Sequence, residues 1–265
     1  MAEHTAGLIA VELGVGARGY FTTRSMASKP VVQGDPYAGF NLALHVGDEP
    51  DRVRAHRAAL EQVLGLGAPA GRRRGIAWMN QVHSARIAPA ALETTPTADA
   101  LLLNTREAGH VTQVPAAAAV LVADCAPVLL ASADGTMVAA VHAGRAGTLS
   151  GIIPAAIAAL SAVGVEPAGI HAVIGPTICG ACYEVSAELH ALAAQTEPAC
   201  ATTTRWGTPG IDLVAGITAQ LERAGVHHVS RIGRCTYEDE ELYSYRRCGV
   251  TGRQAGIAVA AGSGM

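Results

Sequence analysis

The side chains in this sequence best suited to chemistry are one cysteine and two histidines, Cys125, His142 and His83. One thiolate and two imidazoles form an accepted ligand set for catalytic zinc, which leaves one coordination position open for water. The three residues lie far apart along the chain and match no short metal-binding pattern, so the fold must bring them together. Without a metal, Cys125 is a candidate nucleophile with His142 as its base.

A predicted hairpin brings two of these side chains close to each other. Two short apolar runs within residues 128–141 flank Asp134-Gly135, and an Asp-Gly pair between apolar runs is a strong hairpin signal. A turn centred on this pair places His142 opposite Pro127, and Cys125 then lies at the open end of the hairpin. Free cysteine is often only a small buried hydrophobic residue. The hairpin alone therefore favours packing, and the neighbouring segments decide between packing and chemistry.

The segment after the hairpin is rich in glycine and contains Arg145. Residues 142–148 read His-Ala-Gly-Arg-Ala-Gly-Thr, a backbone that can approach a ligand closely, and a helical pattern follows over residues 151–163. A glycine-rich turn before a helix is a common anion-binding site. The next predicted strand covers residues 169–174, and this order of strand, helix and strand predicts a sheet that is at least partly parallel.

His83 ends another predicted strand, over residues 76–83, and the alternation of side chains along a strand places Gln81 on the same face. Further strands are predicted over residues 8–13, 19–24, 99–103, 229–232 and 255–260, with 120–123 as the end of a buried strand. Helices are predicted over residues 48–64, 186–194 and 211–224, and loops over residues 25–36, 65–75 and 199–210. No repeat or linker divides the chain, so a single domain over residues 1–265 is predicted.

The composition excludes several classes of protein. With 265 residues, 50% of them hydrophobic, the chain can bury a large core, and a net charge of −3 with 4% aromatic residues argues against nucleic-acid binding. No run is apolar enough for a membrane span and no export signal is evident, so the six cysteines are predicted to be thiols in a cytoplasmic protein. Cys179-x-x-Cys182 has a spacing found in redox and zinc sites, but without a second such pair it is weak support for either.

The chain resembles the YfiH family, whose members have been described as polyphenol oxidases, laccase-domain proteins and purine nucleoside phosphorylases. The resemblance covers nearly the whole chain and rests on the motifs Phe21-Thr-Thr-Arg24, Asn41-Leu-Ala-Leu-His-Val-Gly-Asp48, Gln81-Val-His83, Ala123-Asp-Cys-Ala-Pro127, Val141-His-Ala-Gly144, Ile174-Gly-Pro176, Tyr183-Glu-Val185, Cys235-Thr236, Ser244-Tyr-Arg-Arg247 and Thr251-Gly-Arg253. It implies a single-domain, mixed-sheet α/β sandwich of the YfiH type. It also implies a Zn²⁺ site formed by His83, Cys125 and His142, with these residues as the catalytic centre.

The resemblance implies purine nucleosides and phosphate as substrates. In phosphorolysis of adenosine, inosine or methylthioadenosine, phosphate displaces the base from ribose C1′, and the turn with Arg145 is the candidate anion site. In adenosine deamination, zinc-activated water attacks the purine. Asn41, Gln81 and Arg24 are further predicted substrate contacts. The family motif His-Ala-Gly-Trp-Arg-Gly reads His142-Ala-Gly-Arg-Ala-Gly147 here, a departure that bears on substrate choice more than on the metal site.

Other functions remain open at this stage. Zinc is preferred over copper because a multicopper oxidase needs clustered histidines, and none of the 10 histidines occurs in a His-x-His pattern. A metal-free Cys/His hydrolase, a peptidoglycan-precursor editing factor and a nucleoside-binding regulatory protein without turnover are the alternatives. A monomer or a weak homo-oligomer is expected, with neither a nucleic acid nor a membrane as partner.

Overall fold

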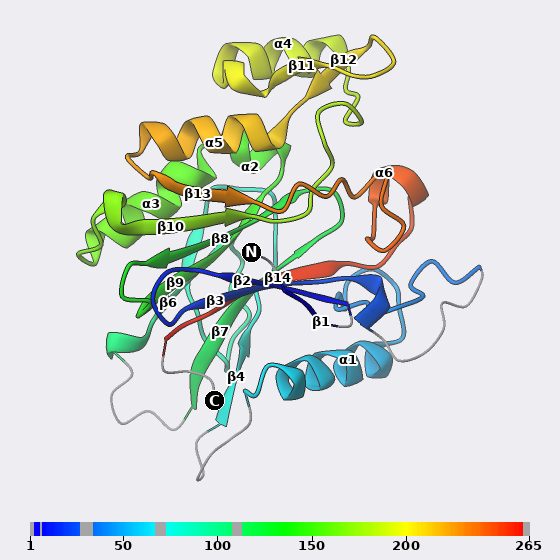
Figure 1. The fold of residues 1–265 in the computed structure, drawn as a ribbon. Coiled ribbons are helices and arrows are strands. Elements are labelled where there is room, and N and C mark those ends of the chain that lie inside the picture. Colours follow the sequence, from blue (N-terminus) through cyan, green and yellow to red (C-terminus); the bar gives the residue numbers. More distant parts are fainter. Residues whose placement is uncertain (1–2, 6, 27–33, 67–72, 108–112, 262–265) are drawn as a thin grey trace.

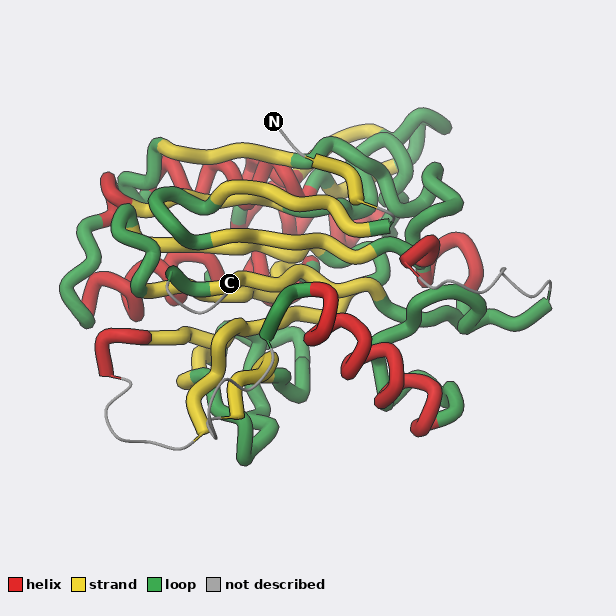
Figure 2. The backbone as a smooth tube through the Cα atoms, turned by 60° about the horizontal axis from the view of Figure 1, so that its bottom comes forward, coloured by secondary structure: helices red, strands yellow, loops and turns green. Residues whose placement is uncertain are grey.

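The computed structural model describes residues 3–5, 7–26, 34–66, 73–107 and 113–261. These residues form two six-stranded sheets that face each other, with helices on the outer faces (Figure 1). A view turned by 60° about the horizontal axis shows neighbouring strands running side by side (Figure 2). The prediction of a mixed-sheet α/β sandwich is confirmed. None of the helices in the described residues is both long and apolar enough to cross a bilayer.

Each sheet mixes parallel and antiparallel pairs. The first sheet has the order β1 (Glu3–Thr5), β2 (Leu8–Glu12), β3 (Arg18–Thr22), β14 (Gln254–Val259), β7 (Gln113–Val122) and β4 (Arg73–Ala77). The second has the order β13 (His228–Arg231), β10 (Ile170–Ile174), β8 (Ala126–Ser132), β9 (Met137–Ala143), β6 (Ala100–Asn104) and β5 (Ile87–Pro89). The helices are α1 (Pro50–Val63), α2 (Arg145–Leu149), α3 (Ile152–Ala162), α4 (Ala187–Thr196), α5 (Leu213–Arg223) and α6 (Tyr245–Cys248).

Three apolar layers hold the sandwich together, because each sheet buries both of its faces. Phe21 and Val120 of the first sheet pack with Leu129 of the second in the layer between the sheets. Helices α3 and α5 cover the outer face of the second sheet. Residues around α1, including Leu60, cover the outer face of the first sheet. This double burial explains why β8 and β9 read as continuous apolar runs.

The central hairpin has the predicted register. His142 pairs with Pro127, and the turn closes at Gly135, whose φ of 68° favours glycine. All residues of β8 and β9 are buried, so the hairpin is a rigid support at the centre of the second sheet. Its open end presents Cys125 and His142, as the sequence predicted.

Two local predictions need correction. The strand predicted over 76–83 is β4, which begins earlier and ends at Ala77. The chain then leaves β7, because Asn80 pairs with Thr97 and residues 82–84 donate their N–H groups to Asp99. The loop predicted over 199–210 contains a small hairpin, β11 (Ala201–Thr203) paired with β12 (Pro209–Ile211), closed by hydrogen bonds to the Thr204 hydroxyl. The prediction of a partly parallel sheet is confirmed, because β9 and β10 run in the same direction with β8 between them, and β10 pairs in parallel with β13. Parts of the predicted loops 25–36 and 65–75 lie outside the described residues.

Candidate active site

A cavity of about 510 Å³ opens at the end of the β8–β9 hairpin. Its wall is assembled from segments that are distant in the sequence, including the loop after β4, the turn between β7 and β8, the start of α2 and the α6 region. The lining side chains that matter for chemistry are Gln81, His83, Asp124, Cys125, His142, Arg145, Tyr183, Tyr245, Arg246 and Arg253.

The structure brings His83, Cys125 and His142 together in this wall, and we call them the His/Cys triad. Their metal-binding atoms all lie within 4.8 Å of one another. The Sγ of Cys125 lies 3.8 Å from Nε2 of His83, and the two imidazole rings meet edge to face with centroids 4.7 Å apart. His142 is buried, Cys125 is half-buried and His83 is exposed, so the triad is accessible from the cavity side.

Asp99, which is fully buried, positions two members of the triad at once. Its Oδ1 accepts hydrogen bonds from Nδ1 of His142 at 2.8 Å and from the backbone N–H of His83 at 2.9 Å. Its Oδ2 accepts from the backbone N–H and the hydroxyl of Ser84. Because Nδ1 of His142 is engaged, Nε2 is the nitrogen left for Cys125 or for a metal. A carboxylate behind a histidine in this manner is the usual partner of metal-binding imidazoles.

Two residues of the site have strained backbone conformations. His83 and Asp124 are the non-glycine residues among the described positions with positive φ, 59° and 94°. Asp124 precedes Cys125 directly, and its carboxylate accepts hydrogen bonds from the Thr236 hydroxyl and from the backbone N–H of Arg246, both at 2.6 Å. Backbone strain of this kind persists only where the surroundings enforce it, and it gathers at functional sites.

Gly144 lies against Cys125 and His83, and its lack of a side chain leaves room for the triad. A Cβ atom at this position would lie 2.8 Å from Sγ of Cys125 and 3.1 Å from Cδ2 of His83. Both contacts are tighter than van der Waals packing allows, so any larger residue must displace two members of the triad. The glycine is therefore required by close approach rather than by its φ of −80°.

The charges of Cys125 and His142 depend on each other. Burial raises the pKa of the Cys125 thiol, but the charge of His142 and hydrogen bonds from His142 and His83 outweigh burial and lower the pKa to about 6. Burial lowers the pKa of His142, but the Cys125 thiolate and the hydrogen bond to Asp99 raise it to about 9. At neutral pH the metal-free pair is therefore a thiolate beside an imidazolium, and a cation that binds here displaces the imidazolium proton.

Positive charge and aromatic surface surround the rest of the cavity. Arg145, Arg246 and Arg253 all line it. The Arg246 guanidinium lies 5.1 Å from the centre of the Tyr183 ring, and that of Arg253 lies 5.9 Å from the Tyr245 ring. The cavity therefore combines a triad suited to a metal, cations suited to an anion and flat rings suited to a planar apolar group.

The predicted substrate contacts fall into two groups. Arg145 and Gln81 line the cavity, although both ends of the Gln81 amide are bonded to the backbone of Leu121. Asn41 and Arg24 lie outside the cavity wall. Buried Asn41 bonds to Ala43, Asp48 and the backbone of Arg253, and the Arg24 Nε donates to the Ala38 carbonyl. These bonds use both ends of the Asn41 amide and the Nε of Arg24, and neither side chain lines the cavity.

Sequence reasoning assigned no role to several residues that shape the site. The sequence marks Asp99 only as the first residue of a predicted strand, although an acidic residue directly before a buried apolar run is a usable signal. Arg246 and Arg253 belong to motifs of the family resemblance, and their charge was the available signal. Asp124 also belongs to one of these motifs, Ala123-Asp-Cys-Ala-Pro127, and its position directly before Cys125 was the available signal.

The donor set of the triad fits zinc. One thiolate and two imidazoles are soft and borderline ligands of the kind zinc accepts, and three protein ligands leave a position for water or substrate. The buried carboxylate of Asp99 supplies the orientation that such a site needs. The 4.8 Å spread of the ligand atoms means that the side chains need only a small inward shift around an ion.

Comparisons with known proteins agree with this fold and show the family. A model of the family described as multi-copper polyphenol oxidoreductase laccase matches residues 18–261. A purine nucleoside phosphorylase of Streptomyces coelicolor is 45% identical over 225 residues, covering 83% of this chain and 88% of the relative. The purine nucleoside phosphorylase YfiH of Shigella flexneri is 34% identical over 225 residues, covering 83% of this chain and 86% of the relative. A crystal structure of a Neisseria meningitidis protein matches with a TM-score of 0.80 at 31% identity, covering 97% of this chain and 100% of the other. The predicted resemblance is thus confirmed, and the chain belongs to the YfiH family, whose model carries the laccase description.

Proposed function

We propose that this chain catalyses the phosphorolysis of purine nucleosides such as adenosine, inosine and methylthioadenosine, with Zn²⁺ held by His83, Cys125 and His142. The observation that carries the proposal is the meeting of the His/Cys triad with three arginines in one cavity. The names of the relatives support purine nucleosides as the substrate class.

A bound zinc ion supplies Lewis acidity and lowers the pKa of water in its open position. Protein residues orient the ligands and keep the site open. Asp99 fixes the ring orientation of His142 and the backbone of His83, so the ligands are held before substrate arrives. Gly144 keeps the space around Cys125 free.

Phosphate is expected to bind among Arg145, Arg246 and Arg253. Guanidinium groups match phosphate oxygens in geometry and keep their charge at every physiological pH. In phosphorolysis a phosphate oxygen forms a bond to ribose C1′ while the bond from C1′ to the base nitrogen breaks, and the released base takes up a proton. The transition state carries positive charge on the ribose, so a phosphate held against C1′ by these arginines stabilises it.

The purine is expected to lie against Tyr183 and Tyr245. Both rings line the cavity, and stacking of a base on an aromatic ring contributes roughly 1–3 kcal/mol to binding. Arg246 and Arg253 pack against the same rings, which supports adjacent positions for the phosphate and the base.

Incubation with adenosine, with and without phosphate, tests the reaction. Adenine and ribose 1-phosphate that form only with phosphate support the proposal. Arg145→Ala and Arg246→Ala are then expected to raise the KM for phosphate, whereas Arg106→Ala is the matched control, because Arg106 pairs with Asp134 outside the cavity lining. Inosine formed in both conditions supports deamination instead, and unchanged adenosine from zinc-loaded protein refutes both reactions.

A second candidate is metal-free nucleophilic catalysis. Cys125, His142 and Asp99 form a chain of thiolate, imidazolium and carboxylate that resembles the catalytic group of cysteine hydrolases. Removal of metal separates the two candidates. Turnover that is lost on chelation and restored by zinc supports the zinc enzyme, whereas turnover that survives chelation supports the cysteine nucleophile.

A further inference from the structure

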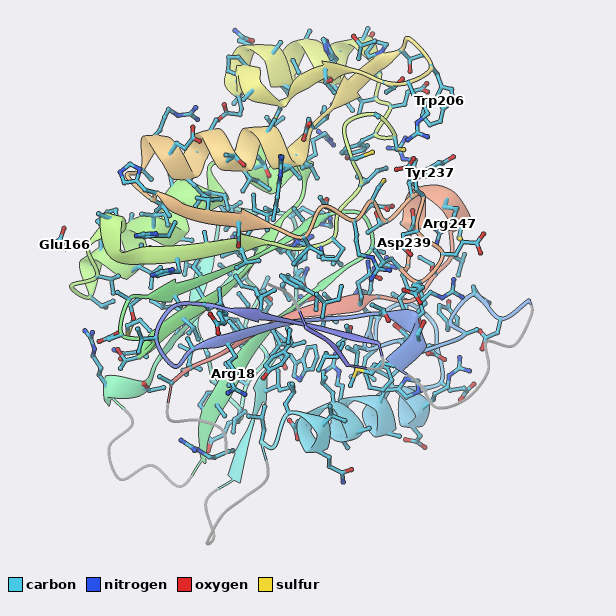
Figure 3. All side chains as sticks on the ribbon, viewed as in Figure 1. Arg18, Glu166, Trp206, Tyr237, Asp239 and Arg247 are labelled. Carbon is cyan, nitrogen blue, oxygen red and sulfur yellow. The ribbon has the colours of Figure 1, made fainter. Side chains whose placement is uncertain are left out.

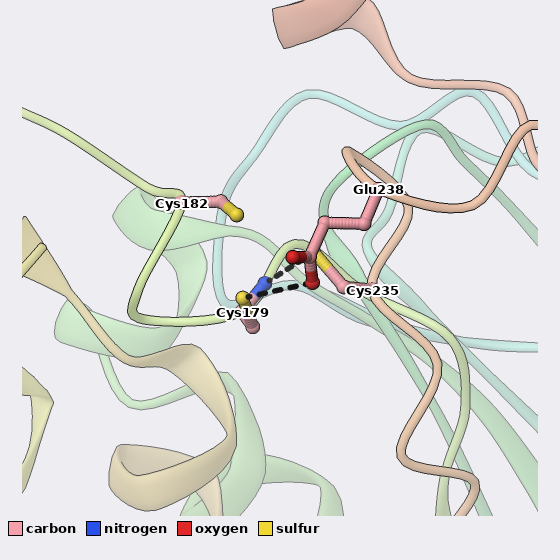
Figure 4. Close-up of side chains that lie close together, drawn as sticks. All are labelled: Cys179, Cys182, Cys235 and Glu238. Atoms are coloured by element: carbon pink, nitrogen blue, oxygen red, sulfur yellow. Dashed lines mark hydrogen bonds between the residues drawn. The ribbon is translucent and has the colours of Figure 1, made fainter. Parts of the chain in front are cut away.

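A second group of metal-binding side chains lies outside the cavity, and we call Cys179, Cys182, Cys235 and Glu238 the thiol cluster (Figure 4). Their sulfur and carboxylate oxygen atoms all lie within 4.8 Å of one another. Cys182 is buried, Cys179 and Cys235 are half-buried and Glu238 is exposed. The sequence pattern contained only the first pair, and the fold adds a third thiol and a carboxylate from a distant segment.

Two short turns of equal spacing present these four side chains. The carbonyl of Cys179 accepts a hydrogen bond from the N–H of Cys182 at 2.9 Å, and that of Cys235 accepts from the N–H of Glu238 at 3.2 Å. Each turn therefore directs its first and fourth residues toward the same point. The backbone N–H of Cys179 donates to Sγ of Cys235 at 3.3 Å and joins the two turns.

We propose that the thiol cluster binds one Zn²⁺ ion in a closed structural site with these four residues as ligands. Thiolates and carboxylates are established zinc ligands, and a four-ligand protein shell is the usual form of a structural site. Zinc–sulfur bonds of about 2.3 Å put tetrahedral ligands roughly 3.8 Å apart, so the observed spread closes with shifts of about 1 Å. Soft thiolates select zinc over magnesium or calcium.

Arg205 balances the charge of the proposed site. Its Nη2 donates to Sγ of Cys182 at 2.8 Å and also to the Glu238 carboxylate. The guanidinium packs on the Trp206 ring at 5.6 Å, and that ring contacts Tyr237 with centroids 6.2 Å apart (Figure 3). The zinc ion and Arg205 together offset most of the negative charge of three thiolates and a carboxylate.

One side of the cluster faces a cavity through which an ion can reach it. This cavity has a volume of about 410 Å³ and is lined by Cys179, Cys235 and Glu238 among others. It is distinct from the cavity at the His/Cys triad, and the two share none of their lining residues.

The proposed ion joins two loops that form the wall of the active-site cavity. The loop with Cys179 and Cys182 also carries Ile178 and Tyr183, which line that cavity, and the loop with Cys235 leads to α6. The second loop is already well defined, because the Arg247 guanidinium donates to four of its carbonyl groups, those of Thr236, Tyr237, Asp239 and Leu242 (Figure 3). The ion therefore has a structural role, which is to fix one loop against the other.

Zinc content measured after dialysis of zinc-replete protein tests the proposal. The full chain is expected to hold two zinc ions, and the double variant Cys179→Ser/Cys235→Ser one. The triad variant Cys125→Ser/His142→Ala is expected to keep one ion, and this result does not depend on the proposed function. Cys248→Ser is the matched control, since Cys248 is an exposed thiol outside both groups, and it is expected to keep both ions.

Cobalt substitution identifies the ligands. The triad variant loaded with Co²⁺ is expected to absorb strongly through thiolate-to-metal charge transfer, because three thiolates remain in the thiol cluster. Glu238→Gln, which alters an exposed side chain, is expected to keep the fold and weaken metal retention, so the test does not depend on the folding of the cysteine variants. A triad variant free of metal, or a thiol count on unfolded protein that falls by two because of a disulfide, overturns the proposal.

Discussion

Replacing Asp99 with asparagine removes the charge that orients the His/Cys triad and changes the side-chain volume little. Both carboxylate oxygens of Asp99 act only as acceptors, and the donors are the His142 ring, the Ser84 hydroxyl and the backbone N–H groups of residues 82–84. An asparagine amide can replace only one of the two oxygens. Whichever way it is turned, its NH₂ group faces a donor.

The expected cost follows from those contacts. Loss of the charge weakens the hydrogen bonds that Asp99 keeps, and the donor facing the NH₂ group loses its partner, so about 3 kcal/mol of stability is lost in all. At about 2 to 4 °C per kcal/mol in a chain of this size, the expected fall in Tm is about 6 to 12 °C. Zinc affinity at the triad is expected to fall about 10- to 100-fold, the usual result when the partner of a metal-binding histidine is lost.

The assay is competition for zinc with a chelator at neutral pH, followed by thermal unfolding of the zinc-free proteins. Glu197→Gln is the matched control, because Glu197 is also a buried carboxylate, paired with Arg223 outside the cavity lining. Glu197→Gln is expected to lower Tm and to leave the affinity of the triad for zinc unchanged. Wild-type affinity in a destabilised Asp99→Asn protein would show that Asp99 serves only folding, and the orientation argument would then be wrong.

The pH dependence of the free energy of unfolding provides a second test of the role of Asp99. Burial raises the pKa of this carboxyl, but hydrogen bonds from His142 and Ser84 outweigh burial and hold the pKa well below its usual range. A carboxyl with a depressed pKa stabilises the fold above its unfolded pKa of about 3.9, and the stabilisation is lost as the pH falls below that value. The stability difference between wild type and Asp99→Asn is therefore expected to shrink below about pH 4.

Three further predictions concern the same cavity. Gly144→Ala is expected to displace Cys125 and His83 and so to weaken zinc binding. Gly169→Ala is the control, because a Cβ there meets its nearest neighbour at 3.7 Å, and zinc affinity is expected to stay unchanged. Equal zinc affinities of the two variants in a chelator titration would contradict the packing argument. Alkylation of Cys125 in zinc-free protein is expected to reach half its maximal rate near pH 6, because the thiolate forms above its lowered pKa of about 6, and a midpoint near pH 8.5 would contradict the ion pair. Asp124→Ala is expected to lower kcat while the far-ultraviolet circular dichroism stays that of wild type, and unchanged turnover would remove Asp124 from the site.

Local signals in the sequence predicted those parts of the fold that depend on neighbouring residues. The Asp134-Gly135 turn sets the register of the β8–β9 hairpin, and the pairing of His142 with Pro127 follows from it without further information. Apolar periodicity predicted the four longer helices, α1, α3, α4 and α5, but not the short helices α2 and α6. Asp212 caps α5 by accepting a hydrogen bond from the N–H of Ala215. These features depend on contacts between residues close together in the chain.

Contacts between distant residues were not predictable in the same way. The bond between Asp99 and His142 joins residues 43 positions apart, and nothing local in either segment indicates the other. The end of β4 also depends on distant residues, because the chain after Ala77 pairs with Thr97 through Asn80 and then donates N–H groups to Asp99. Cys235 reaches Cys179 only through the pairing of β13 with β10, so the thiol cluster had no signal beyond one Cys-x-x-Cys pair.

Two aspartates organise the candidate active site around the β8–β9 hairpin. Asp99 accepts hydrogen bonds from N–H groups of the loop that carries His83. Asp124 accepts hydrogen bonds from the loops that carry Thr236 and Arg246. The Asp124 carbonyl accepts from the backbone N–H of Ile178 and the Thr177 hydroxyl, while its carboxylate accepts from Thr236 and Arg246. The hairpin alone places Cys125 beside His142, but His83 and Arg246 lie in loops that these carboxylates hold through backbone hydrogen bonds. The chemistry of the site therefore depends on acceptors that need not touch the substrate at all, and the types and spacing of the ligands alone do not define it.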